Sequence, residues 1–320
     1  MAEEEEEEFG RIAPDHLTLV FLDIEYVPQR AFCEHPNIRE VICSENVKEI
    51  LGAAFADCYS LRRVIMPGVK LIGNSFIGCQ ALTDVECDKA EIIKEWAFSS
   101  CISLRSINLP SARIIEEGTL SMCDVLTVVK FGNKLERIDR IAFGKCPSLE
   151  RITIPLKDGI ITSDDIFQGC ENLNQVHLEE GEVHETIASF ESEEWRDDMN
   201  REIDSINQIL PNACAGYHNA SGRDAGEKAQ VIRTWIRSVI DKMNHYKAEH
   251  QRLLNEAATL LELAIWKANL DDNNGGRTIC VREGVRTTRG SVKRSRRELC
   301  VTSGASMVVK NVLPFLELKS

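Results

Sequence analysis

Hydrophobic positions follow one pattern seven times between Phe32 and Leu178. Its clearest copies, residues 54–61, 97–104 and 142–149, read Ala-Phe-x-x-Cys-x-Ser-Leu, and apolar residues follow three and five positions after the Leu. Positions equivalent to the Phe fall at residues 32, 55, 76, 98, 120, 143 and 167, which gives a period of 21 to 24 residues. A unit this short cannot bury its apolar side alone, so the repeat predicts stacked coils.

A short strand in each coil is predicted to present the same positions inward, since neighbouring side chains on a strand alternate between faces. The Leu position and the residues three and five after it are apolar or Cys in every coil: Ile38/Val41/Cys43, Leu61/Val64/Met66, Leu82/Val85/Cys87, Leu104/Ile107/Leu109, Leu126/Val129/Phe131, Leu149/Ile152/Ile154 and Leu173/Val176/Leu178. A second inward pair precedes the Phe in most coils: Ile24/Val27, Val47/Ile50, Val69/Ile72, Ala90/Ile93, Ala112/Ile115 and Leu135/Ile138. Each coil therefore has two apolar tracts separated by turns, and Leu17 to Phe21 is expected to cap the first coil.

Helical spacing replaces the repeat after Leu178. Residues 184–210 are predicted to form an amphipathic helix that ends at Pro211, with apolar positions at Trp195, Met199, Ile203, Ile206 and Leu210. From Ile232 to Ala264 the apolar residues alternate steps of four and three, which is a heptad seam in a long second helix. The seam fits either an antiparallel hairpin with the first helix or self-association. A short helix over Met307–Leu316, or a second chain, is expected to cover Leu253, Leu260, Leu261 and Ile265.

The repeat resembles the leucine-rich repeat of the BspA type, whose pattern is Ala-Phe-x-x-Cys-x-x-Leu-x-x-Ile-x-Ile-Pro. Departures are local: Leu120 stands at a Phe position, and His35 stands at the first Cys position. The resemblance implies a mixed β and α protein, with a leucine-rich repeat solenoid of about seven coils followed by a helical hairpin or coiled-coil-like region. Such solenoids are used to bind other molecules. The helical region is similar to C-terminal extensions of some algal repeat proteins, which implies no activity.

Four regions are predicted along the 320 residues. They are an acidic disordered tail (1–16), the solenoid (17–180), a helical region with two long helices (181–275), and a basic loop with a short C-terminal helix (276–320). Glutamates occupy positions 3 to 8, where a secretory signal would be basic and then apolar, and no stretch is apolar enough for a membrane helix. A cytoplasmic protein is therefore expected.

Charge argues against nucleic acid as the partner, because the net charge is −13 and binding to phosphates is led by Lys and Arg. The exception is the basic tract at 277–297. It is interpreted as a solvated loop, with a nuclear address or a polyanion-binding patch as the alternatives. A nuclear address would use Lys293, Arg294, Arg296 and Arg297.

Repeated Phe and Cys positions are predicted to form a structural ladder of buried side chains, with the cysteines as reduced thiols. Its members are Phe55, Cys58, Phe76, Cys79, Phe98, Cys101, Cys123, Phe143, Cys146, Phe167 and Cys170. No Cys-x-x-Cys pair occurs, and thiols spaced one per coil would form a line, so no metal site is predicted.

No phosphate-binding loop, zinc-binding motif or nucleophile elbow is present, so neither catalysis nor a cofactor is predicted. A protein-interaction scaffold is the favoured function, and the alternative is a regulatory subunit or an enzyme with an unrecognised site. Residues between the inward positions must point outward and form one ladder surface. Its Arg62, Arg63, Arg105, Lys130 and Arg151 are predicted to contact an acidic protein partner of unknown identity. A wholly solvated face is the alternative. Assembly is expected to use Ile232–Ala264.

Overall fold

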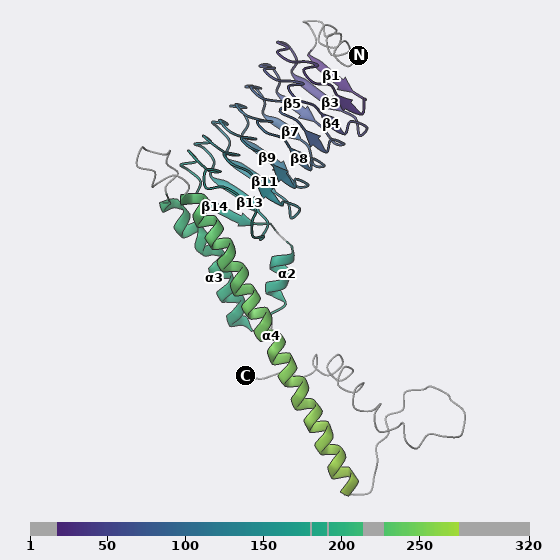
Figure 1. Cartoon of the computed structure of the whole chain (residues 1–320), viewed down its shortest axis with the longest axis vertical. Coiled ribbons are helices and arrows are strands. Elements are labelled where there is room, and N and C mark those ends of the chain that lie inside the picture. The colour runs from purple at the N-terminus through teal and green to yellow at the C-terminus, as the bar shows by residue number, and fades with distance from the viewer. Residues whose placement is uncertain (1–17, 180, 191, 214–226, 275–320) are drawn as a thin grey trace, which may run out of the picture. The chain divides into compact units, whose positions relative to one another are not determined.

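A computed structural model describes residues 18–179, 181–190, 192–213 and 227–274 of the chain. The chain forms two compact units, Met1–Met243 and Asn244–Ser320. Stacked coils followed by helices make up the first unit (Figure 1). The predicted acidic tail, the basic tract and the Met307–Leu316 helix lie outside the described residues.

One side of the coils carries two four-stranded parallel sheets. Sheet A contains β1 (Leu19–Leu22), β3 (Glu40–Cys43), β5 (Arg63–Ile65) and β7 (Asp84–Glu86). Sheet C contains β9 (Ser106–Leu109), β11 (Val128–Phe131), β13 (Arg151–Ile154) and β14 (Gln175–Leu178). Both sheets belong to one continuous succession of coils, but the strand pairing on this side is interrupted between β7 and β9.

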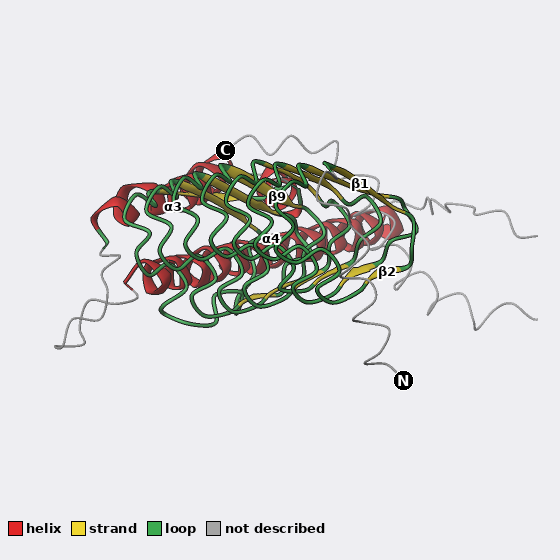
Figure 2. Cartoon of the chain, turned by 90° about the horizontal axis from the view of Figure 1, so that it is seen from above, coloured by secondary structure: helices red, strands yellow, loops and turns green. Residues whose placement is uncertain are grey.

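Two-residue strands line another side of the coils and form the six-stranded parallel sheet B. Its strands are β2 (Tyr26–Val27), β4 (Glu49–Ile50), β6 (Leu71–Ile72), β8 (Ile92–Ile93), β10 (Ile114–Ile115) and β12 (Arg137–Ile138). Figure 2 shows β1 and β9 on one side of the coils and β2 on the other, with loops between them. Each strand pairs with its counterpart one coil away, as stacking requires. The predicted solenoid of about seven coils is confirmed.

Side chains of both apolar tracts fill the space between the sheets. Of the 21 residues predicted inward in the first tract, 20 are buried. Val85 is the exception and is half-buried, because its strand β7 is the last in sheet A. In the second tract Ile24 was also predicted inward, but it is 36% exposed. It lies in the first coil, where none of the described residues forms a preceding layer.

Phenylalanine rings stack from coil to coil in the core. Ring centroids lie 5.1 Å apart for Phe32–Phe55, 5.5 Å for Phe55–Phe76, 5.4 Å for Phe76–Phe98 and 5.5 Å for Phe143–Phe167. Leu120 takes the ring position between Phe98 and Phe143 and separates the two stacks. Neighbouring coils therefore pack against each other through the same position of the repeat.

The cysteine ladder connects neighbouring coils by hydrogen bonds. Each buried thiol donates to the backbone carbonyl oxygen at the Phe position of the preceding coil: Cys58 to Phe32 (3.0 Å), Cys79 to Phe55 (3.1 Å), Cys101 to Phe76 (3.3 Å), Cys123 to Phe98 (3.3 Å), Cys146 to Leu120 (3.0 Å) and Cys170 to Phe143 (3.0 Å). The repeat therefore uses Cys as a compact donor as well as an apolar side chain. His35, at the first Cys position, is buried, and its Nε2 has no partner among the described residues.

Burial should make the core cysteines slow to react with alkylating reagents, and it should make the stability of the fold depend on pH in the alkaline range. It raises the pKa of Cys43, Cys58 and Cys87 from an ordinary 9.0 to about 12. Below about pH 9 these thiols are protonated in both the folded and the unfolded protein. Above about pH 9 they ionise in the unfolded chain but stay protonated in the folded protein until the pH approaches 12. We therefore expect the free energy of unfolding to fall as the pH rises from about 9 toward 12. Urea titrations across this range will measure it, and rapid alkylation of native Cys101 would contradict the burial.

Turns beside the Phe position use left-handed backbone conformations. Positive φ recurs two residues before and two after the Phe, as at Trp96 (59°) and Ser100 (61°) around Phe98. Gly118 has φ 63°, and a Cβ there would lie 2.5 Å from the Trp96 ring of the preceding coil. Other residues adopt the same φ at this position of the repeat, so it is the packing of the Trp96 ring that requires glycine at residue 118.

Two helices follow the solenoid where the sequence predicts one helix over 184–210. They are α2 (Glu182–Ala188) and α3 (Glu193–Ile209), and a 3-10 turn, η1 (Leu210–Asn212), follows α3. The single-helix prediction was wrong because Phe190 turns into the core and Ser192 starts a new helix. The Ser192 side chain accepts a hydrogen bond from Trp195 N, as an N-cap does.

The long helix α4 (Glu227–Asn274) runs antiparallel to α3 in the first unit. Trp235 Nε1 donates to the Glu202 carbonyl oxygen at 3.0 Å, and Lys242 Nζ lies 2.9 Å from carboxylates of both Asp198 and Glu202. Seam residues Ile232, Ile236, Val239 and Met243 are buried. The predicted hairpin is confirmed for this part of the helix.

Both helices of the hairpin close the C-terminal end of the solenoid. Asn207 Oδ1 accepts from Val176 N at 2.9 Å, and the buried Lys228 Nζ donates to the carbonyl oxygens of Glu171 (2.9 Å) and Leu173 (2.6 Å). These side chains meet backbone groups that another coil would otherwise meet, so the hairpin serves as a cap. The predicted division into domains stays a prediction.

The described part of the second unit is the remainder of α4. It exposes five large apolar side chains: Leu253 (45%), Leu260 (67%), Leu263 (55%), Ile265 (42%) and Trp266 (64%). Leu261, predicted to need cover, is half-buried. The heptad seam is therefore buried only up to Met243.

Candidate functional site

Neither a metal-binding cluster nor a membrane-spanning helix occurs in the described ranges. No group of three or more His, Cys, Asp or Glu side chains could hold a metal ion there. Among the same residues, no helix combines the length and the hydrophobicity needed to cross a bilayer. The other features of the described residues are hollows and exposed faces.

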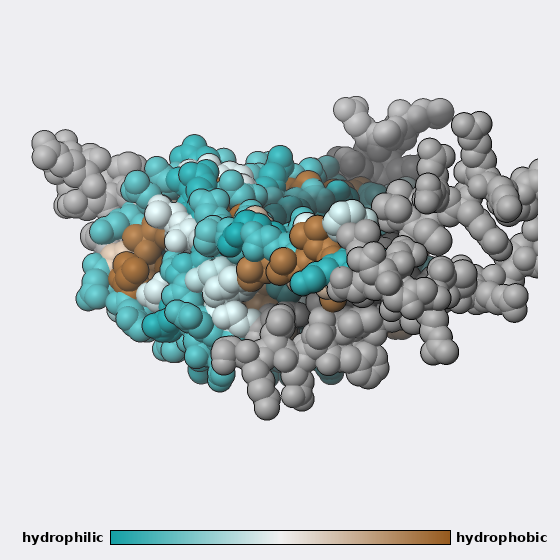
Figure 3. All heavy atoms as spheres, turned by 90° about the horizontal axis from the view of Figure 1, so that it is seen from below, coloured by the Kyte–Doolittle hydropathy of each residue, from teal (hydrophilic) through white to brown (hydrophobic). Residues whose placement is uncertain are grey.

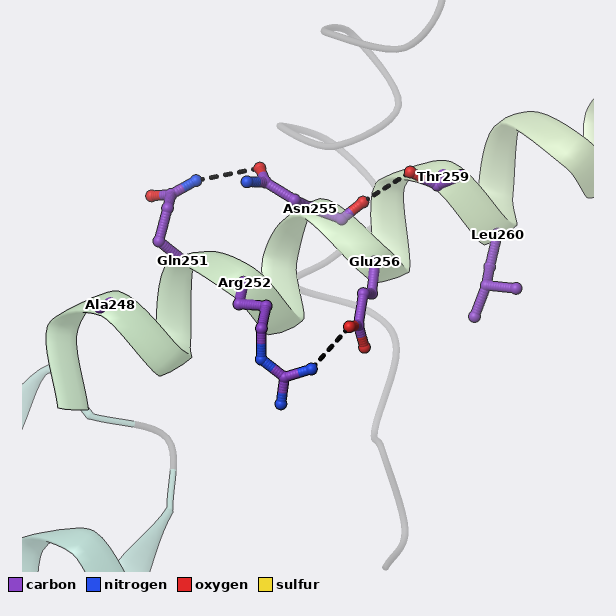
Figure 4. A pocket seen from close by; sticks show the side chains of 7 residues that line it. All are labelled: Ala248, Gln251, Arg252, Asn255, Glu256, Thr259 and Leu260. Carbon is purple, nitrogen blue, oxygen red and sulfur yellow. Dashed lines mark hydrogen bonds and ion pairs between the residues drawn. The ribbon is translucent and has the colours of Figure 1, made fainter. Parts of the chain in front are cut away.

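A hollow along α4 is lined by Ala248, Gln251, Arg252, Asn255, Glu256, Thr259 and Leu260 (Figure 4). All seven side chains come from one helix, and the polar ones bond to each other. Arg252 pairs with Glu256 at 2.7 Å, and Gln251 Nε2 donates to Asn255 Oδ1 at 3.1 Å. These are pairs one helical turn apart, which stabilise a helix surface. The described lining therefore makes no enclosed site.

The outward face of sheets A and C consists of the residues between the inward positions. All five residues of the predicted partner site are exposed on it: Arg62, Arg63, Arg105, Lys130 and Arg151. Arg63 lies on sheet A beside Glu40 and Asp84 of neighbouring strands, and Arg151 lies on sheet C beside Val128 and Gln175. Arg62 and Arg105 immediately precede β5 and β9. The parallel register thus presents the five on one side of the solenoid.

Arg63 is engaged within the face. Its guanidinium lies 2.7 Å from the Glu86 carboxylate and 3.5 Å from that of Glu40, one coil to either side. The hydrogen bond to Glu86 raises the pKa of Arg63 further. Because two carboxylates compensate its charge, Arg63 contributes less positive potential to the face than the sequence suggests.

Three of the predicted cations keep their charge available. Arg62, Arg105 and Lys130 form no ion pair with other described residues, and neither does Arg39, which is also exposed. Arg151 is intermediate, since its Nε donates to the neutral Gln175 Oε1 at 2.7 Å. The basic character of the face therefore comes from these residues more than from Arg63.

The C-terminal end of the face has an open hollow where β13 and β14 meet α3. Its lining is Arg151, Asn174, Gln175, His177, Asn207 and Pro211. Burial, followed by the nearby charge of Arg151, lowers the pKa of His177. Both effects favour the neutral imidazole of His177, and Arg151 is the cation of this hollow.

Apolar side chains interrupt the polar surface (Figure 3). On sheet A, Leu19 and Phe21 are 50% and 65% exposed, and Phe21 lies beside Ile42, which lies beside Ile65. Ile42 and Ile65 stand between inward positions of the repeat, so the pattern places them on the outward face, but the outward positions of Leu19 and Phe21 were missed. The spacing of Leu17, Val20 and Leu22 repeats the inward pattern and could have revealed them.

Solved structures of bacterial repeat proteins resemble this chain. A leucine-rich repeat protein of T. pallidum is 27% identical, with 52% of this chain and 76% of that chain covered and a TM-score of 0.41. A leucine-rich repeat protein from Bacteroides ovatus is 19% identical, covers 50% of this chain and 60% of its own, and has a TM-score of 0.24. No curated protein matches the sequence.

A family model supplies the assignment. The model of the BspA type leucine rich repeat region, in six copies, matches residues 16–114 and 91–193. These ranges include every strand of sheets A, B and C and every repeated Phe and Cys position of the seven coils. Together they cover more than half of the chain. The chain therefore belongs to the BspA-type leucine-rich repeat family.

Proposed function

We propose that the protein is a non-enzymatic scaffold that binds a partner protein through the outward face of sheets A and C. One observation carries the proposal: Arg62, Arg105 and Lys130 are exposed on this face with no ion pair among the described residues. A single exposed cation is common on protein surfaces. Three unpaired cations on one face favour binding of an acidic protein, because interacting surfaces tend to carry complementary charge.

The repeat family supports the proposal, because leucine-rich repeats suggest protein interaction. A solenoid presents a wide surface made from consecutive coils, which suits a protein better than a small molecule. Arginine is also enriched at protein interfaces. The partner's identity is open.

Affinity capture with charge-reversal variants tests the proposal. The full chain carrying Arg62→Glu and Arg105→Glu is compared with the wild type, and bound proteins are quantified by mass spectrometry. Lys134→Glu with Lys157→Glu is the matched control, since both lysines are exposed in turns outside the strands and change the charge equally. Arg63 is unsuitable for reversal, because a third carboxylate at that position would stand between Glu40 and Glu86.

Proteins that bind through the face should be depleted at least about tenfold by the Arg62/Arg105 variant, or roughly 1.4 kcal/mol, and retained by the control. Thermal unfolding should change little for either variant, because neither pair of residues forms an ion pair with other described side chains. Equal capture by the two variants would contradict binding through this face.

We also propose that α4 beyond Met243 assembles the protein with a second copy. The exposure of Leu260 (67%) and Trp266 (64%) supports this assignment, since apolar side chains on a soluble helix generally find cover. Sedimentation of Leu260→Asp should show a smaller species than wild type. A wild-type monomer at every concentration would contradict assembly.

A further inference from the structure

An apolar row crosses three strands of sheet A. It consists of Phe21, Ile42 and Ile65, which are neighbours in the parallel register. Phe21 is 65% exposed, and the other two are half-buried. The core does not need them, because Val20, Val41 and Val64 on the opposite side of the same strands are buried.

An arginine row runs parallel to it where the strands begin. Arg62 N donates to the Arg39 carbonyl oxygen at 2.8 Å, so Arg39 and Arg62 stand on adjacent coils, and their side chains have no ion pair among the described residues. Between the two rows, Arg63 compensates Glu40 and Glu86. Sheet A therefore presents an apolar stripe with two unpaired cations on one flank.

Sheet C has no such stripe. The positions corresponding to the apolar row are Asn108, Lys130, Thr153 and His177, which are neighbours in register and all polar. The combination of apolar and basic rows is thus specific to the N-terminal coils. Within sheet A the row ends at Ile65, because Glu86 takes the corresponding place on β7.

Spacing indicates what fits this stripe. Three adjacent strands span about 9.6 Å, and seven residues of a helix span about 10.5 Å, so helix positions i, i+3 or i+4, and i+7 match the three rungs. An extended peptide presents side chains on one face about every 6.8 Å and would miss the rungs. A helix is about 10 Å wide, and one resting on the apolar row brings its flank toward the arginine row.

We propose that sheet A binds an amphipathic helix of a partner protein, with its apolar stripe on Phe21, Ile42 and Ile65 and its acidic flank facing Arg39 and Arg62. The inference rests on the proposed function, and it specifies the kind of partner and the half of the face that binds it. Apolar contact supplies the affinity, and the arginines select acidic over basic helices.

Three labelled peptides test the inference by fluorescence anisotropy with the full chain. The first is an Ala-based helix with Leu at i, i+4 and i+7 and Glu along one flank. The second carries Lys in place of Glu, and the third keeps the composition of the first but spaces Leu every second residue. The first should bind at least about tenfold more tightly than either of the others.

Matched variants locate the binding. Ile65→Thr and Arg62→Glu should each weaken binding of the first peptide by about tenfold or more. Val128→Thr on sheet C and Lys134→Glu in an exposed turn make comparable changes away from the apolar row and should leave its affinity unchanged. Circular dichroism melting will show that each variant is folded.

No binding of the first peptide, or equal binding of the Glu and Lys peptides, would overturn the inference. So would equal losses for the sheet A variants and for the controls Val128→Thr and Lys134→Glu. The proposed function is judged separately by affinity capture. Depletion of a partner by Arg62→Glu with Arg105→Glu, together with peptides that do not bind, would mean that the face is used by another kind of partner.

Discussion

Truncation of Phe98 to alanine is expected to lower the free energy of unfolding by about 3–5 kcal/mol. Phe98 is fully buried, and its ring stacks on Phe76 at 5.4 Å. The space left by the ring lies between coils that are held by backbone bonds, including Phe98 N to Thr119 O at 2.8 Å. The coils cannot collapse into the cavity without breaking these bonds, which keeps the loss large.

Urea unfolding followed by circular dichroism will measure the loss. Tyr59→Ala is the matched control, since this aromatic residue of the solenoid is 53% exposed and should change the free energy by less than about 0.5 kcal/mol. A loss below about 1 kcal/mol for Phe98→Ala would mean that the ring ladder does not carry the packing.

Replacement of Lys228 by alanine should cost about 2–4 kcal/mol and loosen the helical cap. The ammonium group is buried, and it donates to the carbonyl oxygens of Glu171 and Leu173. Alanine would remove two charge-assisted hydrogen bonds and leave these oxygens buried with fewer donors. We expect faster amide hydrogen exchange in α3 and β14, where Asn207 also joins the cap to Val176.

Lys247→Ala controls for the loss of a lysine from the same helix, because this side chain is exposed. It should leave both the free energy of unfolding and the exchange of β14 unchanged. If Lys228→Ala behaved like Lys247→Ala, the two carbonyl bonds would be dispensable, and the cap would depend on the apolar contacts of Ile232 and Trp235.

The period of the sequence was sufficient to predict the coils. A parallel ladder repeats one inward pattern, so burial of residues such as Leu104, Ile107 and Leu109 follows from their spacing. The same pattern correctly placed Arg62 and Arg105 on the outer surface. It could not show that Arg63 lies between Glu40 and Glu86, because those acids are 23 residues away in either direction and only the register aligns them.

Helical spacing was less informative near its boundaries. Apolar residues recur at steps of three and four from Trp195 to Leu210, but the helix predicted over 184–210 is broken between α2 and α3. Burial of Phe190 and the Ser192 cap outweigh the helical pattern there. Whether a residue such as Phe190 is buried depends on the surface that the folded chain places beside it, and the local spacing of apolar residues does not show this.

By itself, the sequence determined the seven coils, their inward side chains and the long second helix, because these depend on contacts that recur at a fixed separation. Only the tertiary structure decided the interruption between β7 and β9, the thiol bonds to the preceding coil and the cap made by Asn207 and Lys228. The cap joins groups that no period relates, such as Lys228 and Leu173, which are 55 residues apart. The thiol bonds recur with the period, but their donors and acceptors meet only through the register of the stacked coils. Their pairing exists only once the coils have stacked and the helices have closed over the last one.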